Sequence, residues 1–430
     1  MAGQIKSDEI AVNAVDATRQ RGRLDRGSLK DQARLLATGW LITNIALSIA
    51  DLPLKYLLKD QLGLSAPGVS LFFVIGNFTN YIKPVAGMFT DAIPFMGTRR
   101  RHYLLLGVGG GGLFWLMLGA VPRTYASLLI TYTMFYVTVV LTSTSLGGRM
   151  VEVGREHLAA GRLTAQRIGT FRIAAVAGGV VGGWLATKAF GLTVSISASL
   201  HVMLFIMLYR HMQEPPTARI SSTFPGDVNG VFHKLLGSRV LMSAAGMIIL
   251  IAASPGFGTP LFFYQTNNLH FTKPFVGFLT SWNAGFGLIG AWLYFATCRR
   301  LPVQVLLYAC VIVHALGTIT YLFYHSHTSA LLITALAGIT GTMTILPVYD
   351  LAARATPSGA EAVGYAVMMS VWNLTNAFSD WTGSKLFDRW KLTFHSLVWL
   401  NAGTTALVLF VIPLLPTALL RARDGESSGV

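Results

Sequence analysis

Charged residues and cysteines are scarce in this sequence. Only 12% of its 430 residues are charged, whereas soluble domains carry about a quarter, and this deficit excludes an ordinary water-soluble surface. The two cysteines, Cys298 and Cys310, are too few for a disulfide framework or a metal site. We interpret them as inert packing residues, and we expect no metal and no cofactor.

Long apolar runs are what the sequence has instead. Hydrophobic residues make up 53% of the chain, and runs such as 103–121 exceed the roughly 18 residues that cross a bilayer. They predict an all-α membrane protein of twelve transmembrane helices, the first of which is retained rather than removed as a signal peptide. The expected spans are 36–57, 67–90, 103–121, 126–148, 164–187, 190–209, 240–266, 274–297, 303–323, 329–351, 364–384 and 395–419.

The basic residues are distributed asymmetrically between the two sides of the membrane. Of the 33 lysines and arginines, 23 fall in segments on the N-terminal side, and Lys83 and Arg172 fall within spans. The opposite side holds Lys55, Lys59, Arg123, Lys188, Lys273, Lys385, Arg389 and Lys391. This asymmetry follows the positive-inside rule and predicts an inner (plasma) membrane protein with both termini in the cytoplasm. It favours membrane anchoring and contact with anionic lipids over binding to nucleic acid.

The polar stretch 210–239 is the longest connection between spans, and it contains the helix-stopping Glu214-Pro215-Pro216. It divides the chain six helices to six, a layout typical of major facilitator transporters, whose halves alternate around a site near the midplane. The expected domains are a cytoplasmic segment 1–35, a six-helix bundle 36–209, a cytoplasmic linker 210–239, a six-helix bundle 240–420 and a cytoplasmic tail 421–430.

Three local motifs have a plainer explanation than ligand binding. The stretch 107–112 matches the dinucleotide pattern GxGxxG, but it lies inside an apolar span with no preceding strand. Close helix packing explains it better, as it does the glycines between 178 and 183. His325 and His327 could bind a metal, but an exposed polar turn is the favoured interpretation.

Ionisable groups inside a bilayer are costly, so each one is a functional candidate. Asn44 and Asp51 share one helical face in the first span, and Asn373, Asn376 and Asp380 share one in the eleventh. Either aspartate is a candidate proton carrier, because burial favours the protonated form of a carboxyl that lacks a cation. Glu152 is a further proton candidate. A helix-end residue that reaches the headgroups remains the alternative for each aspartate.

Cations in two spans predict binding of an anion. Lys83 shares about a third of a helix circumference with Asn77 and Asn80, and Arg172 lies at a similar depth. An arginine can hold a carboxylate with two hydrogen bonds. The alternative is that both side chains snorkel to the headgroups.

Pro255 and Gly256 interrupt the seventh span and predict a bend at an outer gate. Tyr264 beside this bend is a candidate cavity residue. Trp282 in the eighth span is an aromatic candidate for the same substrate site.

Three stretches resemble the folate–biopterin transporter family of the major facilitator superfamily. The first matches KPxxGxxxDxxPxxGxRRRxY, the second runs over 255–294 and the third over 346–383, so that the resemblance covers about 36–420. The first stretch consists of Lys83, Pro84, Gly87, Asp91, Pro94, Gly97, Arg99, Arg100, Arg101 and Tyr103. One departure is Ser143 and Gly147, where the family often carries two aspartates ahead of Val-Val-Glu.

The resemblance implies a facilitator fold and proton-linked symport of folates, pterins or related compounds. We therefore expect a monomeric secondary active transporter of a small organic anion, with protons as coupling partner. No clustered nucleophile, metal set or catalytic carboxylate pair points to an enzyme. The alternatives are a facilitator-fold transporter of an unrelated organic solute and a lipid scramblase.

The loop after the second span predicts an inner gate. Gly87 and Asp91 end that span beside Arg99, Arg100 and Arg101. An acid next to three cations can form a charge pair in one transporter state and lose it in the other. Together with Pro255 and Gly256, these residues complete the gating set.

Overall fold

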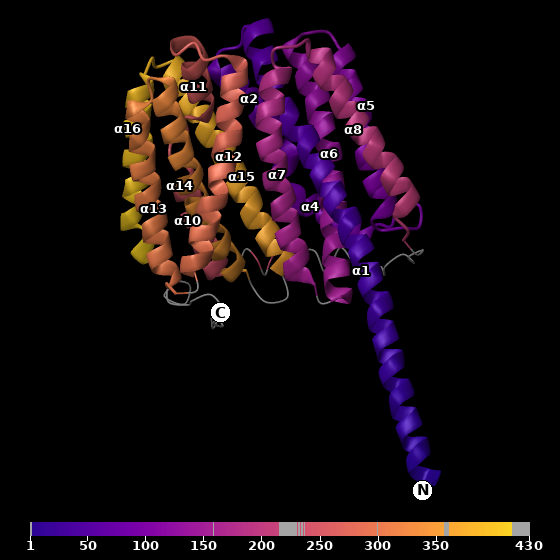
Figure 1. Ribbon diagram of the computed structural model, residues 1–430. Coiled ribbons are helices and arrows are strands. Elements are labelled where there is room, and N and C mark those ends of the chain that lie inside the picture. Colours follow the sequence, from indigo (N-terminus) through magenta and orange to yellow (C-terminus); the bar gives the residue numbers. More distant parts are fainter. Residues whose placement is uncertain are drawn as a thin grey trace.

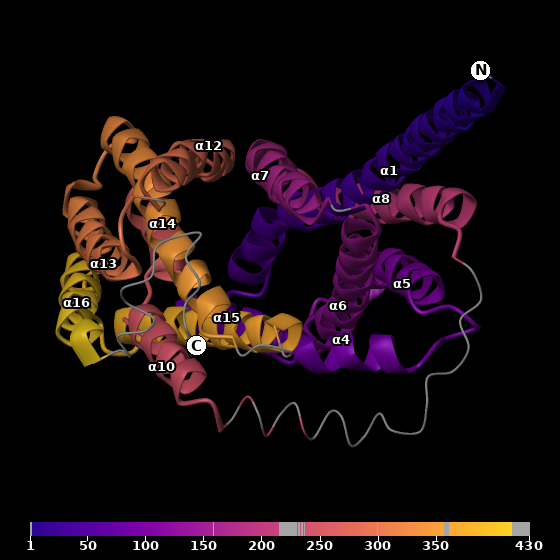
Figure 2. The same cartoon turned by 90° about the horizontal axis from the view of Figure 1, so that it is seen from below.

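The computed structural model describes residues 2–157, 159–214, 230, 233, 235, 237–298, 300–356 and 361–414. Its helices form two groups, one from each half of the sequence, which lie side by side in both views (Figures 1 and 2). The first group contains α1 (Ala2–Tyr56), η1 (Leu57–Gln61), α2 (Ala66–Gly76), α3 (Phe78–Tyr81), α4 (Lys83–Ala92), α5 (Arg101–Ala120), α6 (Tyr125–Glu156), α7 (Ala160–Leu185) and α8 (Phe190–His211).

The second group contains α10 (Arg239–Ala252), α11 (Gly258–Phe263), η2 (Tyr264–Asn268), α12 (Lys273–Cys298), α13 (Val303–Ile319), η3 (Thr320–Phe323), α14 (His327–Arg354), α15 (Glu361–Asp388), α16 (Phe394–Leu407), η4 (Val408–Phe410) and η5 (Ile412–Leu414). The expected linker 210–239 lies mostly outside the described residues, and the tail 421–430 lies outside them entirely. The expected segment 1–35 is, from residue 2 onward, the start of α1, which projects from the body (Figure 1).

Eight helices among the described residues are long and apolar enough to cross a membrane. They are Leu29–Gln61, Arg101–Ala120, Tyr125–Gly154, Arg162–Leu185, Phe190–His211, Gln304–Phe323, His327–Ala352 and Phe394–Leu414. The predicted all-helical membrane fold is confirmed to this extent. The other four expected spans also fall on helices, namely α2 to α4, α10 to η2, α12 and α15. The count of twelve stays a prediction.

The two ends of the molecule pack differently. At the end that carries Gln61 and Lys273, here called the closed end, one apolar cluster joins both groups, with Phe72 from the first and Phe263 from the second. At the opposite end, here called the N-terminal end, no apolar cluster of the described residues joins the two groups. One cluster draws its members from residues 29–212, and two others draw theirs from residues 235–412 and 294–346. The two groups therefore share a core at the closed end and separate toward the N-terminal end.

Glycines bring α7 and α12 into contact at the closed end. A Cβ on Gly183 would lie 2.8 Å from the Cα of Gly277, and Ser281 donates a hydrogen bond to the carbonyl of Val176 in α7. The packing predicted for the glycines at 178–183 is thus confirmed. The 107–112 run packs in the same way, since a Cβ on Gly107 would lie 2.9 Å from the backbone nitrogen of Thr142.

The helix break at Pro255 and Gly256 is present, between α10 and α11. Backbone groups freed by such a break must find partners when they are buried in a membrane protein. The Gly256 N–H donates to the Ser379 carbonyl at 2.9 Å, and the Asn401 side chain donates to the Pro255 carbonyl at 2.9 Å. Helices α15 and α16 therefore stabilise the break.

Candidate functional site

Arg172 lies close to the middle of α7 and reaches across to the second group of helices. Its guanidinium donates to the Thr342 hydroxyl of α14 at 3.3 Å. Gly287 of α12 leaves space for this side chain, because a Cβ there would lie 2.8 Å from the arginine Nη1. Arg172 is therefore a cation at mid-height between the two groups.

Arg167, about one and a half turns from Arg172 toward the N-terminal end, is a site residue that sequence reasoning missed. Its side chain is exposed, and its guanidinium lies 4.5 Å from the centroid of the Trp40 ring in α1. It is also within electrostatic range of Lys83, Tyr349 and Tyr365. An exposed side chain with neighbours on α1, α4, α14 and α15 lies in the space between the groups.

The signal for Arg167 was available in the sequence. The census of basic residues places it with the cytoplasmic loops, although it lies three residues inside the expected span 164–187. A cation within a span is a functional candidate. Counting by span rather than by loop would have added Arg167 to Lys83 and Arg172.

Lys83 begins α4, the last part of a membrane pass that is interrupted twice. The α2–α3–α4 segment breaks at Asn77 and at Ile82. The Asn77 Oδ1 atom is buried and has no hydrogen-bond partner among the described residues, and Asn80 is half-buried. Broken helices in transporters commonly present freed polar groups to a substrate. The breaks therefore place a lysine and an unpaired amide oxygen within two turns of each other.

Lys83, Arg167 and Arg172, together with Tyr349 and Tyr365, are called the cation cluster below. The two tyrosines come from the second group, and Tyr349 is within electrostatic range of both arginines. In the part of the chain that the structure describes, no carboxylate forms an ion pair with the three cations. Cations held within a membrane protein require compensation. The cluster is suited to an anion that also carries an aromatic ring.

Asp51 is paired with a cation, contrary to the premise on which it was selected. Lys55 donates to the Asp51 carboxylate at 2.8 Å, and the Asp51 side chain is 46% exposed. The census of basic residues places Lys55 in an outer loop, but it lies inside α1. It is also within electrostatic range of Asp380. Lys55 is thus paired with one candidate aspartate and near the other.

Asp380 connects three helices at the closed end. Its Oδ1 accepts from the Thr259 N–H at 2.8 Å, and its Oδ2 accepts from the hydroxyls of Thr259 at 2.5 Å and Ser70 at 3.0 Å. The Thr259 contacts cap the N-terminus of α11. Ser70 lies on α2, so the remaining contact crosses between the groups.

The other amide candidates lie on the predicted helices. Asn44 is half-buried in α1, whereas Asn373 and Asn376 are exposed on α15. The Asn376 side chain donates to the Trp372 carbonyl of its own helix at 2.8 Å. No contact joins these amides to the cation cluster among the described residues.

Tyr264 and Trp282 make contacts within the second group. Tyr264 stacks on Phe394 with ring centroids 4.5 Å apart, at the closed end. Trp282 donates to the Leu331 carbonyl of α14 at 3.2 Å. Neither contact brings the ring to the cation cluster.

Glu152 lies in a charged network at the N-terminal end. It accepts from Arg100 at 3.1 Å and from Arg149 at 3.4 Å, and Arg100 is buried. Gly87 has open space where a Cβ would stand. Asp91 lies in α4, but its side chain is outside what the structure describes.

Glu214 is a second residue that sequence reasoning missed, here as a hydrogen-bond partner of the arginine loop. Its carboxylate accepts from the backbone N–H groups of Arg99 at 2.9 Å, Arg100 at 3.0 Å and Arg101 at 2.7 Å. These groups stand at the N-terminus of α5, where an acid is favoured by both hydrogen bonding and the helix dipole. Glu214 therefore ties the end of the first group to the loop that carries the three arginines.

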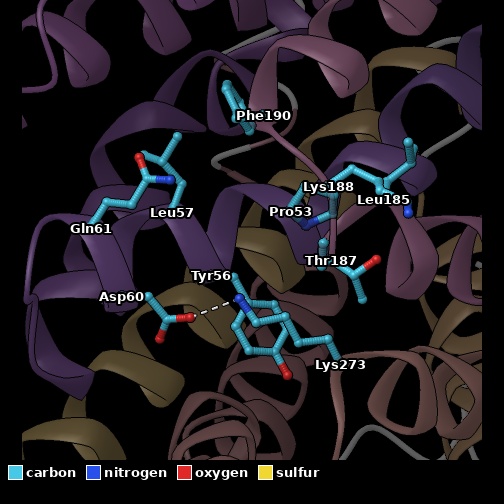
Figure 3. Close-up of a pocket in the computed structure, with 11 residues that line it drawn as sticks. Pro53, Tyr56, Leu57, Asp60, Gln61, Leu185, Thr187, Lys188, Phe190 and Lys273 are labelled. Carbon is cyan, nitrogen blue, oxygen red and sulfur yellow. Dashed lines mark hydrogen bonds and ion pairs between the residues drawn. The ribbon is translucent and has the colours of Figure 1, made fainter.

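The closed end contains a small pocket of about 160 Å³ between η1, the α7–α8 turn and α12 (Figure 3). Lys273 donates to Asp60 at 2.9 Å across it, and the same ammonium lies 4.5 Å from the centroid of the Tyr56 ring. Asp60 and Tyr56 belong to the first group and Lys273 to the second. The pair therefore joins the two groups at this end.

Comparison with known proteins shows which family this sequence matches. Residues 44–427 match the model of the BT1 family. The folate-biopterin transporter of Synechocystis sp. is 27% identical over 408 residues, which cover 88% of this chain and 80% of that relative. Folate transporter 2 of Plasmodium falciparum is 24% identical over 404 residues, covering 86% of this chain and 84% of that relative.

Two solved structures share the fold. A D-xylose-proton symporter superposes with a TM-score of 0.69 at 16% identity, covering 90% of this chain and 97% of that one. The nucleoside transporter NupG superposes with a TM-score of 0.66 at 12% identity, covering 89% and 98%.

Proposed function

The chain belongs to the BT1 family, and from that premise we propose that it carries a folate- or pterin-like organic anion across the inner membrane. Its relatives are named as transporters and cover most of its length, so it is a membrane transporter and not an enzyme. The cation cluster is the observation that carries the substrate class. A folate combines a planar pterin ring with carboxylates, which match the two tyrosines and the three cations respectively.

Alternating access is the proposed mode of movement. In the proposed layout, bundles 36–209 and 240–420 make twelve spans, and the linker 210–239 joins them in the cytoplasm. The shared core at the closed end and the divided cores at the N-terminal end support this mode. With the N-terminal end in the cytoplasm, this conformation faces inward. Gly87, Asp91 and Arg99 to Arg101 form the proposed inner gate, and Pro255 and Gly256 the proposed outer one.

A proton is the proposed coupling ion, with Asp51 as its first candidate site. Asp51 is half-exposed, whereas the carboxylate of Asp380 is already occupied by three hydrogen bonds. An anion moving inward works against a negative interior, at about 2.3 kcal/mol per charge per 100 mV. A co-transported proton offsets that charge, so proton symport allows accumulation.

Binding measurements on purified variants test the substrate class. Lys83→Gln and Arg167→Gln each remove a cation. Each should weaken binding of folate by about tenfold or more, because a charged hydrogen bond contributes about 1.5–3 kcal/mol. Binding of a neutral pterin should stay unchanged. Arg162→Gln is the matched control, since this exposed arginine stands on the same helix outside the cluster. Equal losses for folate and the neutral pterin would show that these cations are structural.

A further inference from the structure

We propose that Lys55 is a mobile cation that couples protonation of Asp51 to the approach of the two helix groups at the closed end. The inference rests on the proposed function, because it names the residue through which the coupled proton acts. Neither the family resemblance nor the predicted polar stripes assign a role to Lys55. Its ion pair with Asp51, and its place beside the part of α2 that holds Asp380, carry the proposal.

The geometry brings Lys55 to the same part of α2 as Asp380. The Lys55 ammonium donates to Asp51 at 2.8 Å and lies 5.9 Å from the centroid of the Phe73 ring in α2. Ser70, one turn before Phe73, donates to Asp380 at 3.0 Å. The ammonium is therefore close enough to Asp380 for the two charges to interact.

The two carboxylates differ in how they can move relative to Lys55. Asp51 stands one turn from Lys55 on α1, so their relation is kept in any rigid movement of the first group. Asp380 belongs to α15 and is held by Thr259, both in the second group. Separation of the groups at the closed end would therefore remove Asp380 from Lys55 and from Ser70. Only with this end closed is Lys55 near both acids.

Protonation of Asp51 changes which acid attracts the lysine. While Asp51 is ionised, it holds the ammonium in a hydrogen-bonded ion pair. When it takes up a proton, that pair is lost and Asp380 becomes the remaining anion for Lys55. The attraction then acts between the two groups and favours the closed conformation.

The other groups around Asp51 do not titrate in the physiological range. Tyr132 and Tyr136 of α6 lie within electrostatic range of it, and Tyr81 of α3 lies near Tyr132. Tyrosines ordinarily ionise near pH 10, so they stay neutral at physiological pH. Because the Asp51 side chain is 46% exposed, a proton can reach it. A proton taken up by Asp51 while the two groups are apart at this end would thus promote their approach.

Accessibility of a buried thiol at the closed end tests this coupling without any substrate. Ser281→Cys places a near-isosteric reporter in the buried contact between α7 and α12, in a full-length chain whose Cys298 and Cys310 are replaced by serine. Its rate of maleimide labelling in detergent is divided by that of a Thr124→Cys reference on an exposed loop. This ratio removes the intrinsic effect of pH on thiol reactivity.

We expect the normalised rate to fall by about fivefold or more from alkaline to acidic buffer. Asp51→Asn, which mimics the protonated acid, should remain protected at both pH values. Lys55→Gln should abolish the pH response, and Lys55→Arg should retain it. Lys188→Gln is the matched control, because this exposed lysine lines the pocket at the closed end and forms no ion pair among the described residues, and it should respond as the parent does.

Two results would overturn the inference: an unchanged pH response in Lys55→Gln, or a pH-independent rate in the parent. If Lys55→Gln does not fold, Asp51→Asn decides, since a preserved pH response there contradicts the proposal. Failure of the proposed function looks different. A protein that takes up neither folate nor biopterin but shows the predicted labelling would refute the substrate and retain the switch.

Discussion

At the residue scale, the structure separates the three acids that sequence reasoning treats alike. Lys55 is ion-paired with Asp51 and lies within electrostatic range of Asp380, whereas Glu152 lies at the other end of the molecule with Arg100 and Arg149. Periodicity alone identifies the polar faces of α1 and α15. It could not show that Lys55 comes near both aspartates, because that proximity depends on how helices from opposite halves of the chain pack.

Asp51→Asn should abolish accumulation of substrate driven by a pH gradient but preserve exchange across equal pH. The amide keeps the shape of the carboxyl but cannot take up the coupled proton. Uptake and counterflow in proteoliposomes measure the two activities separately. Full accumulation in Asp51→Asn would move the proton site to Asp380.

Glu152→Gln should lower stability rather than coupling. Arg100 is buried, so removing its charged partner should cost about 1–3 kcal/mol, less than a fully buried pair because Glu152 is one-third exposed. A thermal unfolding scan of the detergent-solubilised protein measures this loss. A variant of normal stability that has lost pH-driven accumulation would instead make Glu152 a proton site.

At the scale of elements, contact between α7 and α12 holds the closed end together. Gly277→Ala should therefore disfavour closure, because the added Cβ would lie 2.6 Å from the Gly183 Cα. Labelling of the Ser281→Cys reporter should become faster by about fivefold or more if the conformational equilibrium shifts by 1 kcal/mol or above.

Gly285→Ala is the control for this prediction. It adds the same methyl group to α12 where nothing lies within 4 Å of the new atom. The two variants should therefore differ in labelling and agree in expression. Equal labelling rates would show that the glycine contact does not determine closure.

The sequence predicts where the helices lie better than it predicts the breaks within them. The glycine runs and the Pro255–Gly256 break follow from residue type, and both are present. The breaks at Asn77 and Ile82 also have a local signal, which the expectation of one uninterrupted span 67–90 overlooked: Gly76 ends α2, and Pro84 stands in the first turn of α4. The partners that stabilise the Pro255 break, such as Asn401, are distant in the chain and appear only in the folded protein.

At the scale of the whole molecule, the distribution of basic residues predicts the orientation in the membrane. We predict that both termini and the linker 210–239 are cytoplasmic. A cysteine at Ser222 in that linker should resist an impermeant reagent in intact cells, whereas one at Gln61, exposed at the closed end, should react. Rapid labelling at Ser222 would reverse the topology and the proposed inward-facing assignment.

The two halves and their apolar spans could be predicted from composition and charge, because each span carries its own signal. The cation cluster could be predicted only in part. Lys83, Arg167 and Arg172 all stand within expected spans as cations, but Tyr349 and Tyr365 belong to the site only through their positions on α14 and α15. That juxtaposition is a property of the assembled bundle.

Uptake of labelled folate and labelled biopterin by proteoliposomes under an imposed pH gradient tests the central claim most directly. We predict that the wild-type protein accumulates at least one of the two, that dissipating the gradient stops accumulation, and that Arg167→Gln reduces folate uptake far more than Arg162→Gln does. Absence of gradient-dependent uptake of both compounds, in vesicles that contain folded protein, would contradict the proposed function.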